Sequence, residues 1–329
     1  MAYSIKNRSF ASFCILFVFI LGCKKDKIET SLTEINSPTS FDLSCIKFAN
    51  DTGFACGGSL FDKSILLRTT DAGITWQNLP LPLTNEQNKK LVALDVLNSG
   101  ELQVAGFGGI TLRSADFGNT LSFQQEPRFY FWTGLAYRTN NEAYLCGQDG
   151  LKKGYINSVK RSAGWIHPFL ESSHSFGMND IQFFDSLHGY IAGFGAIYKT
   201  TDGGKLWQFT NAKNDNFTST VWFSRQEGVA VGWEGTIAKT DDGGMNWDNI
   251  RSANRVGQRR VRLKCITKNN KDELIAAGEK GCILYSNDKG QSWKEIQNVP
   301  KVNLESVCFQ NEQTFFAVGE EGRIFKIIL

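Results

Sequence analysis

The sequence predicts an all-β fold built from seven copies of one short unit around an axis, and three observations support this prediction. A glycine that ends a short apolar run recurs at intervals from 39 residues (Gly193 to Gly232) to 49 residues (Gly57 to Gly106). Most copies continue into the pattern S/T-x-D-x-G-x-x-W. Aromatic residues make up 12% of the chain and glycines number 32, which suits a turn-rich β protein. A strand-rich unit of this length, repeated seven times, predicts a seven-bladed β-propeller.

Each copy is expected to contribute four antiparallel strands, because its short runs of Val, Ile, Phe and Leu are bounded by Gly, Asn and Asp. The counting glycines are Gly57, Gly106, Gly147, Gly193, Gly232, Gly278 and Gly319. The first strands are expected near residues 43–48, 91–96, 131–137, 178–184, 219–224, 261–266 and 303–308. In the fifth copy the next strands are expected at Gly228 to Val231 and Gly235 to Lys239, and the last begins near Asn246.

The seventh copy, from Val302 to Leu329, reaches the end of the sequence after only three strands. A ring with an incomplete last blade would expose an open strand edge. The segment from Ile28 to Ile35 is therefore expected to supply the missing outer strand. This organisation assigns the propeller to residues 41–329 and its closing strand to the segment before it.

The repeated aspartates fall in the turn between the third and fourth strands, at Asp71, Asp116, Asp202, Asp242 and Asp288. A short carboxylate there can accept hydrogen bonds from turn amides, and the glycine two residues on permits a positive φ. The closing tryptophans, Trp76, Trp207, Trp247 and Trp293, are expected to pack between blades. Because the turns are spread around the ring, they cannot converge on one substrate, so a structural role is predicted.

The N-terminus resembles the signal sequence of a bacterial lipoprotein. Lys6 and Arg8 precede a mostly apolar run, and Gly22 stands directly before Cys23. The resemblance implies that residues 1–22 are a signal peptide and that Cys23 carries the lipid anchor. An ordinary secretory signal or an uncleaved anchor is the alternative. Residues 23–40 read as a polar tether, and the lack of an aspartate after the cysteine favours the outer membrane, with the orientation left open.

Charge and cysteine content exclude several classes of protein. The net charge is +3, and removal of Lys6 and Arg8 leaves 36 − 2 = 34 basic residues against 33 acidic ones, so no bulk affinity for nucleic acid is expected. The cysteines lack zinc-type spacing. Buried free thiols are favoured over disulfides, although Cys45 and Cys56 could face each other across the first hairpin. No metal or cofactor site is expected.

The pattern S/T-x-D-x-G-x-x-W is the Asp-box of sialidase-type repeats, and here V-G-x-x-G-x-I precedes it, as in Val231-Gly232 and Gly235-Thr236-Ile237. In this combination the chain resembles the photosystem II stability/assembly factor family of seven-bladed propellers, over residues 41–329. The resemblance implies a non-catalytic binding or assembly scaffold with a protein or peptide client. The protein is expected to be a monomer. Nothing in the sequence indicates a photosynthetic host.

The candidate binding site is a basic loop at residues 251–264, which contains no acidic residue. In a four-stranded blade this loop shares a face with the G-x-x-G turns. The resemblance implies an arginine-rich client site, which Arg255-Val256 and Arg260-Val261 match loosely. The candidate ligand-binding residues are Arg255, Arg259, Arg260 and Arg262. Guanidinium groups pair with carboxylates, so an acidic peptide is the expected ligand, and a solvated basic loop is the alternative.

The competing hypothesis is a sialidase-like glycoside hydrolase or a carbohydrate-binding propeller. Such an enzyme needs two carboxyl groups about 5 to 10 Å apart. Glu126, Glu171 and Glu234 lie in loops expected on the binding face. Trp132, Trp222 and Trp233 could form a sugar-stacking surface. The arginine motif typical of sialidases has no match, so the non-catalytic scaffold is favoured.

Overall fold

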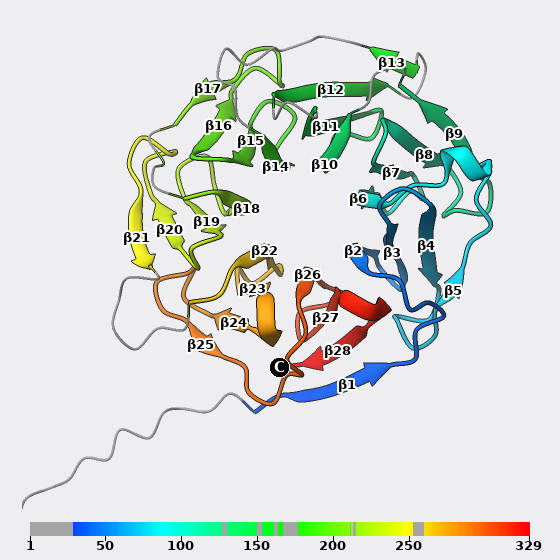
Figure 1. Cartoon of the computed structure of the whole chain (residues 1–329). Coiled ribbons are helices and arrows are strands. Elements are labelled where there is room, and N and C mark those ends of the chain that lie inside the picture. The colour runs from blue at the N-terminus through cyan, green and yellow to red at the C-terminus, as the bar shows by residue number, and fades with distance from the viewer. Residues whose placement is uncertain are drawn as a thin grey trace, which may run out of the picture.

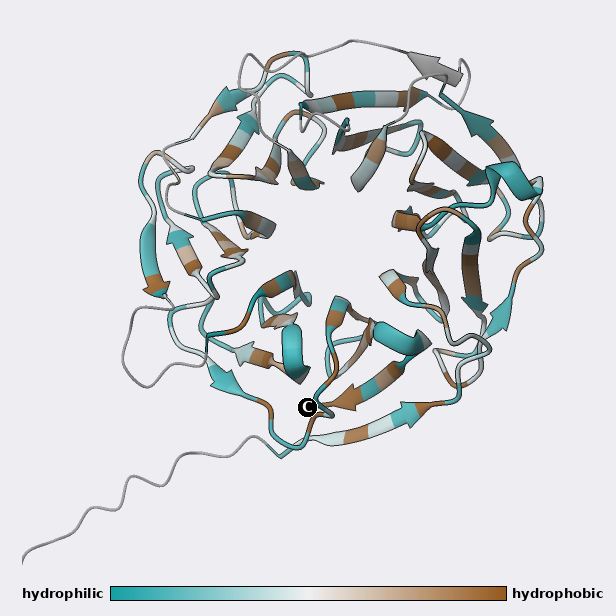
Figure 2. Ribbon diagram, viewed as in Figure 1, coloured by the Kyte–Doolittle hydropathy of each residue, from teal (hydrophilic) through white to brown (hydrophobic). Residues whose placement is uncertain are grey.

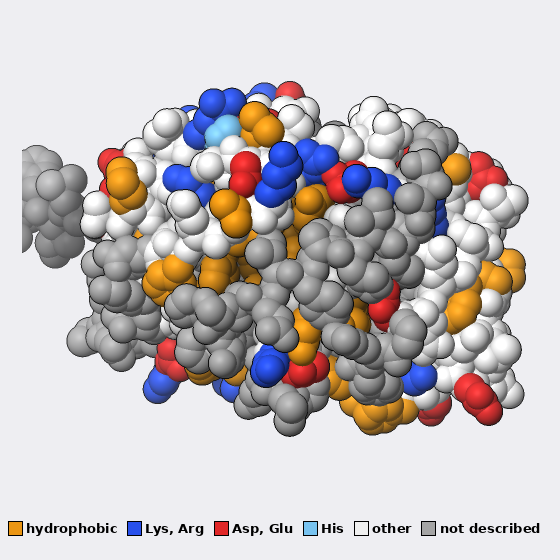
Figure 3. Space-filling view, turned by 90° about the horizontal axis from the view of Figure 1, so that it is seen from above, with side chains coloured by type: hydrophobic (Ala, Val, Ile, Leu, Met, Phe, Trp, Pro, Cys, Tyr) orange, Lys and Arg blue, Asp and Glu red, His pale blue; other side chains and the backbone are white. Residues whose placement is uncertain are grey.

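The computed structural model describes residues 29–126, 130–149, 153–160, 164–166, 177–210, 212, 215–252 and 260–329. In these residues seven four-stranded antiparallel sheets stand as blades around a central axis (Figure 1). Each blade runs from an inner strand beside the axis to an outer strand at the rim. Seen edge-on, the ring is a thick disc with two broad faces (Figure 3). The predicted all-β, seven-bladed propeller is confirmed.

The first three blades follow one another along the chain. Blade 1 contains β2 (Leu43–Ala49), β3 (Thr52–Ser59), β4 (Lys63–Thr69) and β5 (Gln77–Asn78), followed by the 3-10 turn η1 (Asn85–Gln87). Blade 2 contains β6 (Leu91–Val96), β7 (Leu102–Gly106), β8 (Ile110–Ser114) and β9 (Ser122–Gln125). Blade 3 contains β10 (Phe131–Thr139), β11 (Glu142–Gln148), β12 (Gly154–Lys160) and β13 (Gly164–Ile166).

The remaining blades repeat the same order. Blade 4 contains β14 (Met178–Phe183), β15 (Gly189–Gly193), β16 (Ala196–Thr200) and β17 (Gln208–Phe209). Blade 5 contains β18 (Phe217–Trp222), β19 (Gly228–Gly232), β20 (Ile237–Thr240) and β21 (Asp248–Arg251). Blade 6 contains β22 (Leu263–Lys268), β23 (Leu274–Gly278), η2 (Glu279–Gly281), β24 (Ile283–Ser286) and β25 (Lys294–Glu295). Blade 7 contains β26 (Leu304–Phe309), β27 (Thr314–Gly319), η3 (Glu320–Gly322) and β28 (Ile324–Ile328), and β1 (Ser31–Ile35) is its outer strand. The helical segments of the described chain are single 3-10 turns, and none has the length or apolar character to cross a membrane.

The ring is closed by β1, as predicted. This strand pairs antiparallel with β28, with Ser31 opposite Ile328 and Ile35 opposite Ile324. Figure 1 shows β1 lying along the outside of the C-terminal blade. Leu32 and Ile35 pack into the apolar clusters on the two sides of blade 7. The closing strand thus covers the edge that the C-terminal copy would otherwise expose.

The clearest differences in where strands begin lie in blades 5 and 6: β22 of blade 6 begins at Leu263, two residues after its expected start. Blade 5 differs at two strands. Its inner strand begins at Phe217, two residues before the expected start, because a bulge between Phe217 and Ser219 lets Phe217 pair with Gly232. Its third strand begins at Ile237, because Gly235 belongs to a turn and has a φ of +72°. The equivalent bulge occurs near the start of every inner strand.

Close packing of the backbone explains why the position used to count the copies is a glycine. At Gly57 and Gly278 an added Cβ would overlap the carbonyl oxygens of Asp42 and Arg262, each of which stands directly before an inner strand. Gly106, Gly147 and Gly319 meet the corresponding carbonyl in their own blades. The backbone of the inner strand therefore lies too close to the second strand for any side chain at this position. Hydrophobic residues concentrate along the strands, and the 3-10 turns are hydrophilic (Figure 2).

Candidate binding face

The direction of the strands divides the connections between two faces. The turns from the first to the second strand and from the third to the fourth share one side, which we call the Asp-box face. The turns from the second to the third strand and the connections between blades share the other, which we call the loop face. Hydrogen bonds on the loop face hold these turns to the connections between blades. The Glu279 N–H donates to the carbonyl of Arg262, directly before β22 of the same blade (3.0 Å), and the Gly281 N–H donates to the carbonyl of Val302, in the connection to blade 7.

On the Asp-box face the repeated aspartates serve their own turns. Asp71 accepts hydrogen bonds from the Thr69 hydroxyl (2.7 Å) and from the Thr75 N–H and hydroxyl (2.9 and 2.6 Å). These bonds lower the pKa of Asp71 to about 2. The Thr69 hydroxyl in turn accepts from the Gly73 N–H (3.0 Å). Asp116, Asp202, Asp242 and Asp288 accept from their turns in the same way, and the pKa of each lies below its ordinary value.

Each Asp-box turn also touches the blade before it. Gly73, with a φ of +80°, lies against the ring of Phe316 in blade 7. Trp76 is 7% exposed and packs edge-on against Phe48 and Phe316. Trp207, Trp247 and Trp293 also lie in or against clusters shared by two blades. The carboxylates are distributed around the ring, and their bonds hold turns rather than a ligand.

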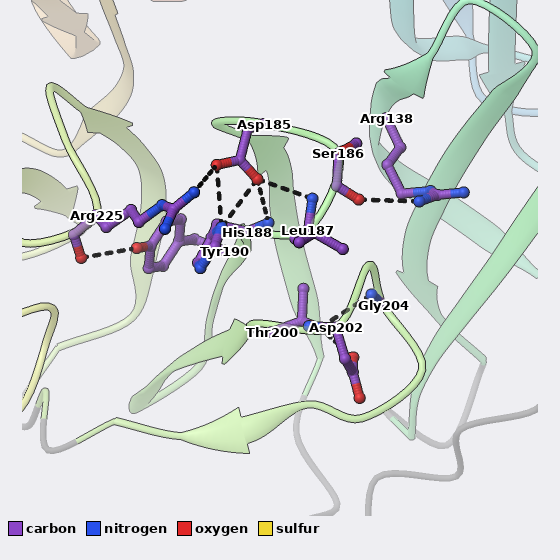
Figure 4. Close-up of polar contacts among 10 residues, drawn as sticks. All are labelled: Arg138, Asp185, Ser186, Leu187, His188, Tyr190, Thr200, Asp202, Gly204 and Arg225. Carbon is purple, nitrogen blue, oxygen red and sulfur yellow. Dashed lines mark hydrogen bonds and ion pairs between the residues drawn. The ribbon is translucent and has the colours of Figure 1, made fainter.

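A polar network on the same face joins blades 3, 4 and 5 (Figure 4). The Asp185 carboxylate accepts hydrogen bonds from the Leu187 and His188 N–H groups (2.8 Å each) and pairs with Arg225 of blade 5 (3.2 Å). Arg138 of blade 3 donates to the Ser186 carbonyl (2.9 Å). The contacts of Arg225 and Arg138 reach the same turn of blade 4 from the blades on either side, so the network holds blades together.

On the loop face, the basic segment places two arginines at the seam between blades 5 and 6. Val261 and Leu263 are buried, so the alternating Arg260 and Arg262 side chains point outward and are 72% and 51% exposed. Arg260 pairs with Glu234 at 2.5 Å. The other two predicted arginines, Arg255 and Arg259, lie outside the described residues, as does the proposed lipidation site Cys23.

Arg262 lies on an aromatic platform. Its guanidinium carbon is 4.7 Å from the centre of the Trp233 ring, and one of its nitrogens is 3.5 Å from Glu279. Trp233 is itself 40% exposed. A guanidinium over an indole face gains a cation–π attraction of about 0.5–1 kcal/mol at an exposed site. The stacking limits the directions that this cation can take.

The turn that carries Trp233 and Glu234 is held by hydrogen bonds to three residues. The Trp233 N–H donates to the Asn216 carbonyl (3.1 Å), and the Glu234 N–H donates to both carboxylate oxygens of Asp215 (3.1 and 3.2 Å). The buried Arg251 donates to the Gly235 carbonyl (2.6 Å). The platform is therefore built on a rigid turn.

The loop face also presents apolar side chains, of which only Trp233 was singled out from the sequence. The residue after the counting glycine is aromatic in three blades: Phe107, Phe194 and Trp233. In blade 1 the turn between β3 and β4 exposes Leu60 and Phe61 by 40% and 62%. The Phe61 ring meets that of Phe107 at 6.2 Å. The position after the counting glycine could have indicated Phe107 and Phe194, whereas that pattern does not mark Leu60 and Phe61.

The inner strands enclose a central cavity of about 320 Å³. Lys47 of blade 1, Asp95 of blade 2 and Asp180 of blade 4 line it. Burial opposes the charge of Lys47, but the nearby carboxylates outweigh it and raise its pKa. The Ser219 hydroxyl donates to Asp180 (2.8 Å), and burial raises the pKa of that carboxyl. Cys45 lies opposite Cys56 in the β2–β3 register, and the six cysteines of the described chain are free thiols.

The glutamates proposed for a glycosidase do not form a catalytic carboxylate pair among the described residues. Glu126 is 6% exposed at the end of β9, Glu234 is paired with Arg260 in blade 5, and Glu171 lies outside the described residues. Trp132 and Trp222 are buried, so Trp233 is the exposed one of the three tryptophans proposed for sugar stacking. The described part of the chain contains no group of three potential metal ligands.

The fold and the face together define an Asp-box β-propeller with an arginine–aromatic cluster at one seam. The chain belongs to the family described as photosynthesis system II assembly factor YCF48, whose model matches residues 158–270 and 254–328, together more than half of the chain. A curated relative, the chloroplastic photosystem II stability/assembly factor HCF136 of Cyanidioschyzon merolae, is 21% identical over 214 residues, 56% of this chain. The chain spans about half of that relative's length (48%).

Solved structures support the fold. A structure described as YCF48 bound to D1 peptide is 18% identical, with a TM-score of 0.71, over 92% of this chain and 98% of that one. YCF48 from Cyanidioschyzon merolae is 17% identical, with a TM-score of 0.70, over 90% and 98%. An inactive virginiamycin B lyase from Staphylococcus aureus is 14% identical, with a TM-score of 0.72, over 92% and 100%. At these identities the likeness concerns the architecture, which serves both binding proteins and enzymes.

Proposed function

We propose that this protein is a non-catalytic scaffold of the cell envelope that captures an acidic polypeptide on its loop face. The observation that carries the proposal is the exposed cluster of Arg260, Arg262 and Trp233 on a rigid turn. Guanidinium groups bind carboxylates through two parallel hydrogen bonds, and the indole holds one guanidinium in place. Membership of an assembly-factor family and the peptide complex of a structural relative support a polypeptide partner.

The present ion pairs of the two arginines do not prevent such binding. Both pairs are formed between side chains that are at least a quarter exposed. Exposed ion pairs contribute about 0–1 kcal/mol each, so an incoming carboxylate can exchange with Glu234 or Glu279 at little cost. The acids then keep the arginines extended until the partner arrives.

The test is capture of a partner by affinity purification from native membranes, followed by a binding titration with the purified partner. We expect the Arg255→Ala/Arg259→Ala/Arg260→Ala variant to lose capture. Arg262→Ala alone is expected to weaken binding at least tenfold, because it removes the stacked guanidinium. Lys301→Ala is the matched control, since Lys301 is an exposed cation on the same face. Equal affinity of the arginine variants and the control would reject the site, and turnover of glycosides by the purified protein would reject the non-catalytic assignment.

Anchorage through Cys23 in the outer membrane is part of the proposal. Because β1 is antiparallel to β28, Ser31 lies at the Asp-box end of blade 7, beside Ile328. The eight residues from Cys23 to residue 30 span at most about 26–29 Å. The Asp-box face would then be directed toward the membrane and the loop face away from it.

The anchorage is tested by replacing Cys23 with alanine, which should release the protein from membranes. Its orientation is tested with two engineered cysteines of equal exposure, at Phe61 (62% exposed) on the loop face and Ile74 (63%) on the Asp-box face. We expect a bulky maleimide to label position 61 several-fold faster on membranes and both positions equally in detergent. Equal rates on membranes would reject the orientation.

A further inference from the structure

Blade 1 has an outer strand that is shorter than the sheet it covers. β5 pairs with β4 only at Gln77 and Asn78, and the Leu79 N–H adds one more bond, to the Leu66 carbonyl (2.9 Å). The chain then continues as Leu-Pro-Leu-Pro, and Pro80 and Pro82 divert it from the sheet, since proline is poorly tolerated in a strand. The first half of β4 is left without an outer neighbour strand.

A cavity of about 530 Å³ occupies that position, within the range of ligand sites in proteins. β4 residues Lys63 to Leu66 form part of its wall. The segment Pro38–Phe41 bounds it on the side of blade 7, where the Thr39 carbonyl lies against Gly322. Leu79, Leu81 and Leu83, which pack against the apolar cluster between blades 1 and 2, bound it on the other side.

Backbone groups of β4 face this cavity. The Gly58 N–H donates to the Asp42 carbonyl, on the β2 side, so the neighbouring Gly57 directs its backbone groups toward β4, where it pairs with Ile65. Because backbone groups alternate in direction along a strand, those of Ile65 face β3, and those of Ser64 and Leu66 face away from the sheet, toward the cavity. The Ser64 N–H donates to the Asn88 side chain (2.6 Å). Within the described part of the chain, no hydrogen bond is made to the Ser64 carbonyl or by the Leu66 N–H.

The walls define the chemistry of an occupant. Ile65 and Leu66 are buried, and Phe41 is 39% exposed at the edge of the cavity, so an apolar side chain fits between them. Lys63, at the start of β4, is exposed and has no ion-pair partner among the described residues. A segment running antiparallel to β4, as β5 does, would end beside Lys63.

We propose that this cavity is a second peptide-binding site, in which an extended segment of a partner completes the outer strand of blade 1. The segment donates a main-chain hydrogen bond to the Ser64 carbonyl and accepts one from the Leu66 N–H. It places an apolar side chain between Phe41 and Leu81 and sets a carboxylate beside Lys63. This is strand addition to an open sheet edge, in which main-chain bonds provide affinity and side-chain pockets provide selectivity. The inference extends the proposed scaffold function to a site distinct from the arginine cluster.

The probe is an array of octapeptides, each made with a free and with an amidated C-terminus, applied to the full chain. We expect binding by peptides that carry an aliphatic or aromatic residue next to a carboxylate. The paired peptides separate a terminal carboxylate from an acidic side chain. In the complex, hydrogen exchange should slow in the peptide fragment that covers Ser64 to Leu66.

Two variants test the location. Ser40→Trp, at an exposed position on the cavity wall, should fill the cavity and weaken binding at least tenfold, and Lys63→Glu should weaken it about fivefold. Lys301→Glu is the charge-matched control on the same face and should bind as the wild type. A thermal melt verifies that each variant is folded, and Lys63→Glu still tests the site if Ser40→Trp does not fold.

The outcomes separate this site from the arginine cluster. No binding on the array, or binding that neither variant weakens, overturns the inference. Binding lost in Arg260→Ala/Arg262→Ala but kept in Ser40→Trp also overturns it, while the proposed function stands. Binding lost in Ser40→Trp and kept in the arginine variant supports the second site by itself.

Discussion

Trp76 offers the sharpest test of the conclusion that the Asp-boxes hold the propeller together. Its indole is 7% exposed and lies in the cluster that joins blade 1 to blade 7, with Phe48 at 5.9 Å and Phe316 at 6.5 Å between ring centres. Ile35 of the closing strand packs against the same cluster. Truncation to alanine therefore removes packing at the junction where the ring closes.

The expected magnitude follows from burial. Trp→Ala in a packed core costs about 3–5 kcal/mol, because transfer and cavity contributions add. At about 2 °C per kcal/mol for a chain of this size, Trp76→Ala should lower Tm by about 6–10 °C. Trp76→Phe should cost less, because a ring remains and because the indole N–H, which has no hydrogen-bond partner in the described chain, is removed.

The assay is thermal unfolding of both Trp76 variants beside Trp233→Ala. Trp233 is 40% exposed on the loop face, so its truncation should change Tm by less than about 2 °C while affecting partner binding. A Tm of Trp76→Ala within 1–2 °C of wild type, or a loss no larger than that of Trp233→Ala, would refute the reasoning.

Two further predictions concern stability. The pKa of Asp71 is lowered to about 2 in the folded protein from an unfolded value near 4. Its hydrogen bonds therefore stabilise the fold above pH 4, and this contribution is lost as the pH falls toward 2. Asp71→Asn should flatten that part of a plot of Tm against pH, and an unchanged slope would contradict the argument. Deletion of residues 24–40 removes β1 and the burial of Leu32 and Ile35, about 1 kcal/mol each, and should lower Tm by at least about 4 °C. Deletion of residues 24–30 is the control and should leave Tm unchanged. Equal effects of the two deletions would show that β1 does not stabilise the ring.

The repeat architecture could be predicted from the sequence because its determinants are local. The hydrogen bonds of an Asp-box join residues at most four positions apart, as between Asp71 and Thr75. The same turn therefore forms wherever the motif recurs in the sequence. The missing outer strand followed from counting, because three strands in the last copy require a fourth from elsewhere. The exact start of blade 5 did not follow, because the bulge at Phe217 depends on how the inner strand meets Gly232.

The candidate site could be predicted only in outline. The sequence shows the cluster of basic residues near position 260. In that segment buried Val261 and Leu263 alternate with the exposed arginines, as an extended strand requires. The acid opposite Arg260 is Glu234, 26 residues earlier, in a different blade. No local pattern assigns that partner, because the ring geometry decides which turns meet at a seam.

The sequence by itself thus determined the number of blades, the Asp-box turns and the need for a closing strand, because each depends on short-range hydrogen bonding or on the pairing of strands that follow one another. The tertiary structure alone decided the stacking of Arg262 on Trp233, the charges that line the central cavity, and the cavity between Phe41 and Leu81. These features join residues from different blades or from connections on either side of one blade, and the charges of the central cavity come from blades 1, 2 and 4. Their distances are set by how the sheets pack around the axis.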